Sequence, residues 1–247
     1  MRGPFFIGIG GVLSADIAAP DHEREREFYA KVLTTGPEPL WRDDLTNCMG
    51  TPVIGLGART PEYESLPLQW MPHVQVSDVA TSAGRAVDLG GRELMHGKGD
   101  DGRSLWAVLA DPAGAAFGVI PVAAGESQDA GPPMKTGRIA WLSLEVADVP
   151  AVYEFYERVV GWSAAPASAD GGRELRRHDG VAVGEIRPQR GGSDVIPSVW
   201  LLHLPVGDLE ASLRRVRAGG GEVVREAAEG AVIRDPVGVC IALQALE

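Results

Sequence analysis

Two histidines stand at matching places in two apolar runs of the sequence. The stretches QWMPHVQVSDV, beginning at Gln69, and VWLLHLPVGDL, beginning at Val199, share the frame W-x-x-H-x-x-V-x-D with His73 and His203 at its centre. The ordinary pKa of histidine lies near neutral pH, so the side chain suits acid–base chemistry and ligand hydrogen bonding. A histidine in an apolar strand also occurs as a hydrogen-bonded core residue, and for both histidines this structural interpretation stays open.

Each histidine lies in a segment that reads as a strand followed by a helix and further strands. The segments DVATSAGRAVDLGG and DLEASLRRVRAGGG begin with Asp78 and Asp208, and both close on a pair of glycines. Aspartate can cap the start of a helix and glycine can end one. The turn signatures DPAG and DPVG, beginning at Asp111 and Asp235, then introduce the apolar runs AAFGVIPV and VCIALQAL.

A second pair of related units precedes these two. SADIAAPDHEREREFYAKVL, from Ser14, matches WLSLEVADVPAVYEFYERVV, from Trp141, and each contains a Phe-Tyr pair seven residues after an aspartate. The Gly- and Pro-rich stretch AAGESQDAGPPMKTG separates the two halves. We therefore predict two homologous domains, residues 1–123 and 137–247, joined by a linker at 124–136.

Composition excludes several classes of function. The 247 residues carry a net charge of −11 without a Lys/Arg cluster, so we expect no nucleic-acid partner. No run approaches the roughly 20 apolar residues of a membrane span. The N-terminal run is similar to a signal peptide, but glycines interrupt it and we expect a strand there. Two cysteines favour a reducing, cytoplasmic location, and a homodimer is left open.

The order of these units, the phrase EFYERVVGW and the ending DPAGAAFGV resemble the vicinal-oxygen-chelate superfamily, which includes glyoxalase I, bleomycin-resistance proteins, fosfomycin-resistance enzymes and extradiol dioxygenases. The sequence is most similar to two-domain glyoxalase-like proteins of actinobacteria, often labelled hydroxylases. The resemblance implies an α+β fold of two tandem glyoxalase-like domains, in which four βαβββ modules form curled mixed sheets around clefts. It implies no particular chemistry, because this fold hosts many.

Enzymes of the superfamily usually hold a divalent metal through His, Glu or Gln on the first and last strands of each module. In this sequence the corresponding first-strand positions are Ser14, Met71, Trp141 and Leu201. The last-strand positions are Gly118 and Ala242, with Gly55 and Gly184 in the other two modules. None of these is a ligand for a hard or borderline cation, although a shift of one residue would bring Glu185 into place of Gly184. We therefore expect no metal and no cofactor.

The resemblance also places particular side chains in the clefts. In the first domain Asp16 and His73 would form a carboxylate–imidazole pair, in which the ionised carboxylate raises the pKa of the imidazole. In the second domain His203 would have only Ser143. The remaining predicted ligand-binding residues are Met71, Trp106, Gly118, Trp141 and Leu201. Trp70 and Trp200, on the opposite face of their strands, are expected in the core.

The leading functional hypothesis is a metal-free protein that binds an apolar or aromatic small molecule, in natural-product metabolism or resistance. The alternative is a lyase, isomerase or cyclase that uses His73 and Asp16 as acid–base groups. A non-catalytic interaction protein whose clefts have closed over is a third. The first domain is favoured as the functional one, because it has the carboxylate and a longer loop region, ELMHGKGDDGRSLW, that would cover its cleft.

Overall fold

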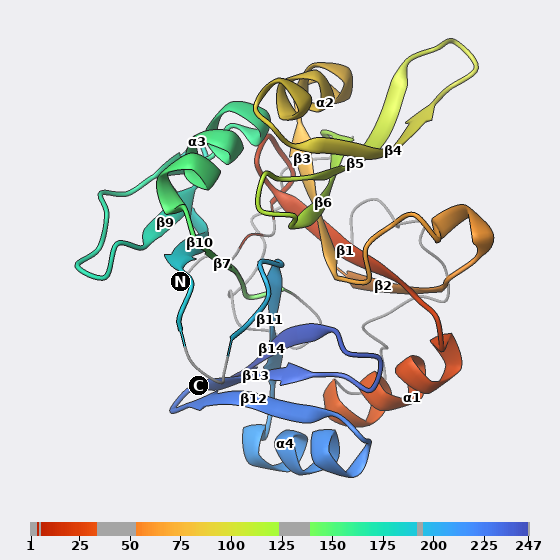
Figure 1. Cartoon of the computed structure of the whole chain (residues 1–247), viewed down its shortest axis with the longest axis vertical. Coiled ribbons are helices and arrows are strands. Elements are labelled where there is room, and N and C mark those ends of the chain that lie inside the picture. Colours follow the sequence, from red (N-terminus) through yellow and green to blue (C-terminus); the bar gives the residue numbers. More distant parts are fainter. Residues whose placement is uncertain (1–3, 5, 34–52, 124–138, 192–194, 247) are drawn as a thin grey trace.

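The described residues form two mixed β-sheets and four α-helices. The structure is a computed structural model that describes residues 4, 6–33, 53–123, 139–191 and 195–246 (Figure 1); the predicted linker lies outside these residues. The first half contains β1 (Val12–Ala19), α1 (His22–Leu33), β2 (Val53–Ala58), the 3-10 turn η1 (Pro61–Tyr63), β3 (Met71–Val76), α2 (Val79–Asp88), β4 (Arg92–Lys98), β5 (Ser104–Ala110) and β6 (Ala116–Pro121).

The second half follows a similar order, and in its described residues three strands of the same module come after each helix. It contains β7 (Trp141–Val146), α3 (Val149–Val160), β8 (Ser163–Ala164), β9 (Arg173–Arg176), β10 (Ala182–Pro188), β11 (Leu201–Val206), α4 (Leu209–Ala218), β12 (Glu222–Ala227), β13 (Gly230–Arg234) and β14 (Cys240–Ala245). Each half forms its own sheet, in the order β2-β1-β3-β6-β5-β4 and β12-β13-β14-β11-β7-β10-β9-β8. The predicted α+β fold of tandem βαβββ modules is confirmed. In the described part of the chain no helix is long and apolar enough to cross a membrane.

The predicted helix boundaries follow from local chemistry. Asp78 and Asp208 cap α2 and α4, each accepting a backbone N–H three residues on, at 2.7 and 2.8 Å. Just after these helices Gly90 and Gly220 adopt φ values of +84° and +86°, a conformation that favours glycine. These turns return the chain to the sheet at the angle that the following strands need.

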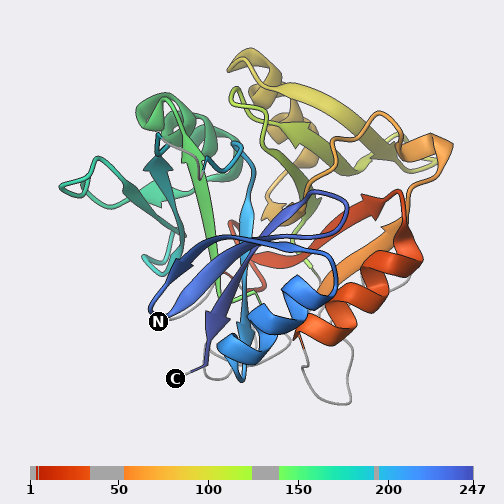
Figure 2. The same cartoon turned by 60° about the horizontal axis from the view of Figure 1, so that its bottom comes forward.

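The helices of the two halves pair across the molecule. α1 packs against α4, and α2 packs against α3 (Figures 1 and 2). The Ser82 hydroxyl donates to the carbonyl of Val159, and the Ser212 hydroxyl donates to that of Val32, both at 2.8 Å. Each half therefore satisfies buried polar groups of the other, so the two domains interlock through their helices.

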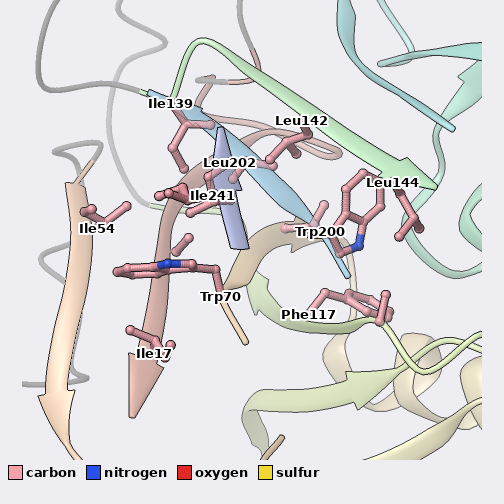
Figure 3. Close-up of a cluster of buried hydrophobic side chains, with 14 of the residues drawn as sticks. Ile17, Ile54, Trp70, Phe117, Ile139, Leu142, Leu144, Trp200, Leu202 and Ile241 are labelled. Atoms are coloured by element: carbon pink, nitrogen blue, oxygen red, sulfur yellow. The ribbon is translucent and has the colours of Figure 1, made fainter. Parts of the chain in front are cut away.

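A chain of aromatic and carboxyl groups continues this interlock into the core. Trp70 and Trp200 are buried as predicted, and their side chains belong to one core that joins both sheets (Figure 3). The indole N–H of Trp200 donates to the Tyr156 hydroxyl at 2.8 Å, and that hydroxyl donates to Oδ2 of Asp111 in the other half at 3.1 Å. Trp70, Tyr29 and Asp235 form the equivalent chain, with distances of 3.3 and 2.8 Å.

One of these two chains carries an extra carboxyl group. Glu25 on α1 is fully buried beside Asp235, where α3 has Val152 at the matching position. Burial and then the neighbouring Asp235 carboxyl raise the pKa of Glu25 to about 9, and burial raises the pKa of Asp235. Since two adjacent buried carboxylates cannot both be ionised, Glu25 is neutral in the folded protein at pH 7.

Replacement of Glu25 by glutamine should raise stability at alkaline pH. The folded-state pKa lies above the unfolded value, so the contribution of Glu25 to stability is complete below about pH 4.5 and is lost as the pH rises through about 9. We expect Glu25→Gln to exceed the wild type in free energy of unfolding at pH 9 by at least about 1 kcal/mol, equivalent to roughly one pKa unit. Urea unfolding at pH 5, 7 and 9 measures this.

Glu27→Gln is the matched control, because Glu27 lies on the exposed side of the same helix. Its unfolding free energy should follow the wild type at all three pH values. Equal pH dependence in Glu25→Gln and the wild type would show that Glu25 is already ionised in the fold.

Candidate functional site

A cleft of about 310 Å³ lies on the face of the first sheet that points away from α2. We call it the first cleft. All five residues predicted for this domain line it: Asp16, Met71, His73, Trp106 and Gly118. Most of the remaining lining is apolar and includes Leu66, Met95 and Ile120. The first cleft is therefore open rather than closed over, and its polar groups are few.

Strand pairing explains why these side chains meet. β1 runs antiparallel to β3, which places Asp16 opposite Met71 and Ser14 opposite His73. β3 runs parallel to β6, with His73 beside Gly118. Because alternate residues of a strand share a face, Asp16, Met71 and His73 all project into the cleft. Oδ2 of Asp16 lies 3.5 Å from Nε2 of His73, within ion-pair distance.

Gly118 has a steric role in this arrangement. A Cβ atom at this position would lie 2.5 Å from Cδ2 of His73, closer than real Cβ contacts. The imidazole ring of His73 thus occupies the space in front of β6 that a side chain at 118 would need. Glycine at the last-strand position is what allows His73 to lie in the cleft beside Asp16.

The prediction that Asp16 raises the pKa of His73 is wrong. Burial lowers the pKa of His73 to about 4, although a carboxylate lies 3.5 Å away. An attraction at that distance would raise the pKa of His73, but the loss of hydration on burial against mostly apolar walls is the larger effect. His73 is therefore neutral at pH 7, with one ring nitrogen that donates a hydrogen bond and one that accepts.

Trp106 forms part of the rim of the first cleft. Its indole packs on the backbone of Gly97, where a Cβ atom would lie 2.2 Å from the ring. The side chain is 38 % exposed, and the neighbouring Leu105 is 49 % exposed. An indole fixed against glycine and open to solvent on its other side provides a flat surface on which a planar ligand can stack.

A second, larger cleft of about 640 Å³ lies on the equivalent face of the second sheet. The four residues predicted for this domain line it: Trp141, Ser143, Leu201 and His203. The Ser143 hydroxyl and Nε2 of His203 are hydrogen-bonded at 2.8 Å. Burial, and then Arg187, lower the pKa of His203 to about 4. Trp141 lines this second cleft without closing it.

Ion pairs distinguish the second cleft from the first. Arg225 of β12 holds Glu145 of β7 at 2.5 Å, and both side chains are largely buried. The sequence does not predict this pair, because β12 and β7 lie far apart in the sheet order and meet only through the curl of the sheet. The repeat offset of 130 residues, however, aligns Arg225 with Met95, which lines the first cleft. The two clefts thus differ at equivalent positions.

The second cleft also corrects the expected last-strand position. Glu185, not Gly184, pairs with Ser143, as Gly55 pairs with Asp16 in the first sheet. Glu185 therefore faces the cleft, but its carboxylate lies 2.8 Å from the Arg187 guanidinium. An acidic side chain paired with arginine is a poor metal ligand.

The donor sets of the two clefts do not fit the metal that the superfamily resemblance implies. The first cleft offers two nitrogen- or oxygen-bearing ligands of the usual kind, Asp16 and His73, whereas catalytic metal sites of this type use about three protein ligands. No group of three or more His, Cys, Asp or Glu side chains occurs within the described ranges in a position to hold a metal ion.

Known proteins are similar to this chain in sequence. CFP32 of Mycobacterium tuberculosis, a glyoxylase by name, is 29% identical over 241 residues, 90% of each chain. The anthracycline biosynthesis protein DnrV of Streptomyces peucetius is 27% identical over 169 residues, which cover 68% of this chain and 60% of DnrV.

Solved structures extend the similarity of fold. The 2,2',3-trihydroxybiphenyl 1,2-dioxygenase of Sphingomonas wittichii RW1 superposes with a TM-score of 0.57 at 14% identity, covering 99% of this chain and 90% of the other. The Mn(II)-bound glyoxalase of Novosphingobium aromaticivorans gives 0.53 at 16% identity, covering 99% and 82%.

The family assignment rests on both halves of the chain. The family model of the glyoxalase-like domain matches residues 13–120 and again residues 141–243. These two ranges contain the strands that line the first and second clefts. The chain therefore belongs to the glyoxalase-like domain family of the vicinal-oxygen-chelate superfamily, with two copies of the domain in tandem.

Proposed function

We propose that the protein binds a planar, largely apolar aromatic compound in the first cleft, without a metal ion, and acts in natural-product metabolism or resistance. The observation that supports this most directly is the chemistry of the lining, which is apolar apart from Asp16, His73 and the Tyr63 hydroxyl. Ligand pockets of this kind combine apolar walls with a few polar groups that fix orientation. The volume of about 310 Å³ lies at the small end of the range of ligand pockets, roughly 300–1,000 Å³.

Asp16 and His73 would determine which edge of the ligand points to the polar end of the first cleft. The Asp16 carboxylate accepts hydrogen bonds, and the neutral His73 imidazole both donates and accepts. A phenolic or enolic hydroxyl beside a carbonyl would match this pair, while the ring system would lie against Met71 and stack on Trp106. Stacking of this kind contributes about 0.5–1.5 kcal/mol beyond area burial.

The name of one relative supports a natural-product role. DnrV is named for anthracycline biosynthesis. Its similarity to this chain covers 68% of the residues here, so the natural-product role is carried to this protein as part of the proposal.

Catalysis at the same site is the second candidate. The carboxylate–imidazole pair at 3.5 Å favours an isomerase, lyase or cyclase in which Asp16 removes a proton and neutral His73 donates a hydrogen bond to the developing oxyanion. A histidine with a pKa of about 4 is a weak base at pH 7, so the roles of the two residues would not be interchangeable. Product formation from a ligand that quenches tryptophan fluorescence separates this enzyme from a binder.

Loss of His73 should weaken binding in the first cleft. We expect His73→Ala to raise the Kd for 1-hydroxyanthraquinone at least tenfold, about 1.4 kcal/mol, because the polar edge of the ligand loses a partner. Quenching of tryptophan fluorescence and calorimetry measure the Kd. Anthraquinone, which lacks the hydroxyl, should bind more weakly to the wild type and lose less on substitution.

His203→Ala is the matched control, because His203 holds the equivalent position in the second cleft and should change the Kd little. Equal losses from the two variants, or a loss from His203→Ala alone, would move the site to the second domain.

Gly118→Ala should act on the ligand through His73. The new methyl group would displace the imidazole, so we expect a loss of affinity similar to that of His73→Ala. In a His73→Ala background the same change should have little further effect, because the ring that it displaces is gone. A double-mutant cycle with binding as the readout tests this. Gly84→Ala is the control, because among the described residues no neighbouring atom lies within 4 Å of the place that a Cβ at Gly84 would take.

The pH dependence of binding follows from the neutral imidazole. The folded-state pKa of His73 lies below the unfolded value near 6.5, so its contribution to stability is present above pH 6.5 and is lost as the pH falls through about 4. Binding of an uncharged ligand should therefore be constant from pH 5.5 to 8 and weaken only towards pH 4. A ¹H NMR titration of the imidazole, identified with His73→Gln, checks this; a midpoint near 6.5 would contradict it.

A further inference from the structure

The β4–β5 hairpin carries a hydrogen-bonded chain of a hydroxyl, an imidazole and a carboxylate that the first cleft does not use. Nε2 of His96 lies 2.8 Å from Oγ of Ser104, and Nδ1 of the same ring lies 3.0 Å from Oε2 of Glu93. The hairpin forms the outer edge of the first sheet (Figure 1). The equivalent hairpin of the second half is shorter and contains no histidine or serine.

Two irregularities of strand pairing bring these side chains to one face. Pairing shifts by one residue between Glu93 and Met95, and again between Gly97 and Lys98. Strict alternation would place residues 93 and 96 on opposite faces of β4. With the two bulges, Glu93 and His96 lie on the same face as Ala107, whereas Trp106 and Met95 face the first cleft. Bulges that re-aim side chains in this way are frequent beside active sites.

The order of the hydrogen bonds is the one that activates a hydroxyl. A carboxylate at Nδ1 holds the proton on that nitrogen, which leaves the lone pair of Nε2 directed at the Ser104 hydroxyl. Positioned in this way, His96 can take the proton of Ser104 as the oxygen attacks. The His96 side chain is 14 % exposed and Ser104 is partly exposed, so a small molecule can reach both.

Two neighbours complete the requirements of acyl transfer. Lys98 lies directly across the ladder from Ser104, so its exposed side chain projects from the same face. Its ammonium group is suited to stabilise an oxyanion that forms at the carbonyl carbon attacked by Ser104. Leu105 follows Ser104 at the edge of the sheet, exposes 49 % of its surface and also lines the first cleft, so it offers an apolar contact from the rim that the two faces share.

We propose that Ser104 is the nucleophile of a second, esterase-like site that accepts activated esters such as aryl esters. His96 is its general base, and Glu93 is the positioning residue. The Ser104 oxygen attacks the ester carbonyl while its proton passes to Nε2 of His96. The ester C–O bond then breaks, and the alcohol or phenol leaves with that proton. Water, deprotonated by His96, hydrolyses the acyl-serine, releases the carboxylic acid and restores the hydroxyl.

Covalent labelling of the full-length chain tests the nucleophile. Protein incubated with 4-nitrophenyl acetate, or with a fluorophosphonate, should acquire one adduct on Ser104, located by peptide mass spectrometry. Ser104→Ala should remove the adduct, and His96→Gln should slow labelling at least about a hundredfold, the usual contribution of a general base. Ser163→Ala, at an exposed serine of β8, is the matched control and should label like the wild type.

Circular dichroism and urea unfolding of each variant show that the hairpin substitutions leave the fold intact. An adduct on another residue, an unlabelled wild type, or a His96→Gln variant that labels at the wild-type rate would each overturn the proposal. These outcomes are independent of ligand binding in the first cleft, which lies on the other face of the sheet.

The role of Glu93 has a readout that a structural role would not change. Glu93→Gln keeps the size of the side chain but removes the carboxylate that holds the proton on Nδ1 of His96, so it should slow labelling of Ser104. Glu93→Asp, which keeps a carboxylate, should restore part of the rate. A Glu93→Gln variant that labels at the wild-type rate would show that the carboxylate does not act on His96.

Discussion

The buried hydrogen bond from a tyrosine of one half to an aspartate of the other is the interaction on which the rest of the structure depends. Asp111 accepts the Tyr156 hydroxyl on one oxygen and the backbone N–H groups of Ala113 and Ala115 on the other. It thereby shapes the turn that starts β6, the strand that carries Gly118. In the other half Asp235 does the same for β14.

The tyrosine hydroxyls also connect to the strands that carry the histidines. Each accepts the indole N–H of a tryptophan, Trp70 or Trp200, that immediately precedes β3 or β11. A buried hydroxyl that lost either partner would leave an unsatisfied polar group, at a cost of about 1–3 kcal/mol. Each tyrosine thus connects the histidine strand of its own half to the turn before the last strand of the other half, which helps explain why tandem domains with separate sheets form one core.

The two clefts lie on equivalent strands of the duplicated domains, but they differ in chemistry because several equivalent positions carry different side chains. Asp16 of the first cleft corresponds to Ser143 of the second, and Met95 corresponds to Arg225. In the second cleft the charges pair with each other, as in Glu145 with Arg225. In the first, one carboxylate and one neutral imidazole remain against apolar walls, so hydrogen bonding there is concentrated at one edge.

The fold and the lining of the two clefts could be predicted from the sequence because the motifs that indicate them are local or occur twice. The W-x-x-H-x-x-V-x-D frame predicts the buried tryptophans, the helix caps at Asp78 and Asp208 and the face on which His73 lies. What it did not predict depends on contacts between distant segments. The direction of the His73 pKa shift reflects how closely the cleft walls surround the ring. The hairpin chain of Glu93, His96 and Ser104 depends on two bulges that break the alternation used to read a strand.

The relation between His73 and Gly118 also bears on how this cleft differs from the metal sites of its superfamily. The superfamily resemblance implies a metal-ligand position at residue 118, which is glycine here, and a Cβ atom placed on it would collide with the His73 imidazole. A ligand at position 118 and an imidazole in the observed place are therefore mutually exclusive. Any side chain at position 118 would occupy the space of the His73 imidazole. The same volume can therefore hold either a metal ligand on β6 or the imidazole of His73 beside Asp16. The first cleft has the second of these, with Asp16 and His73 as its polar end.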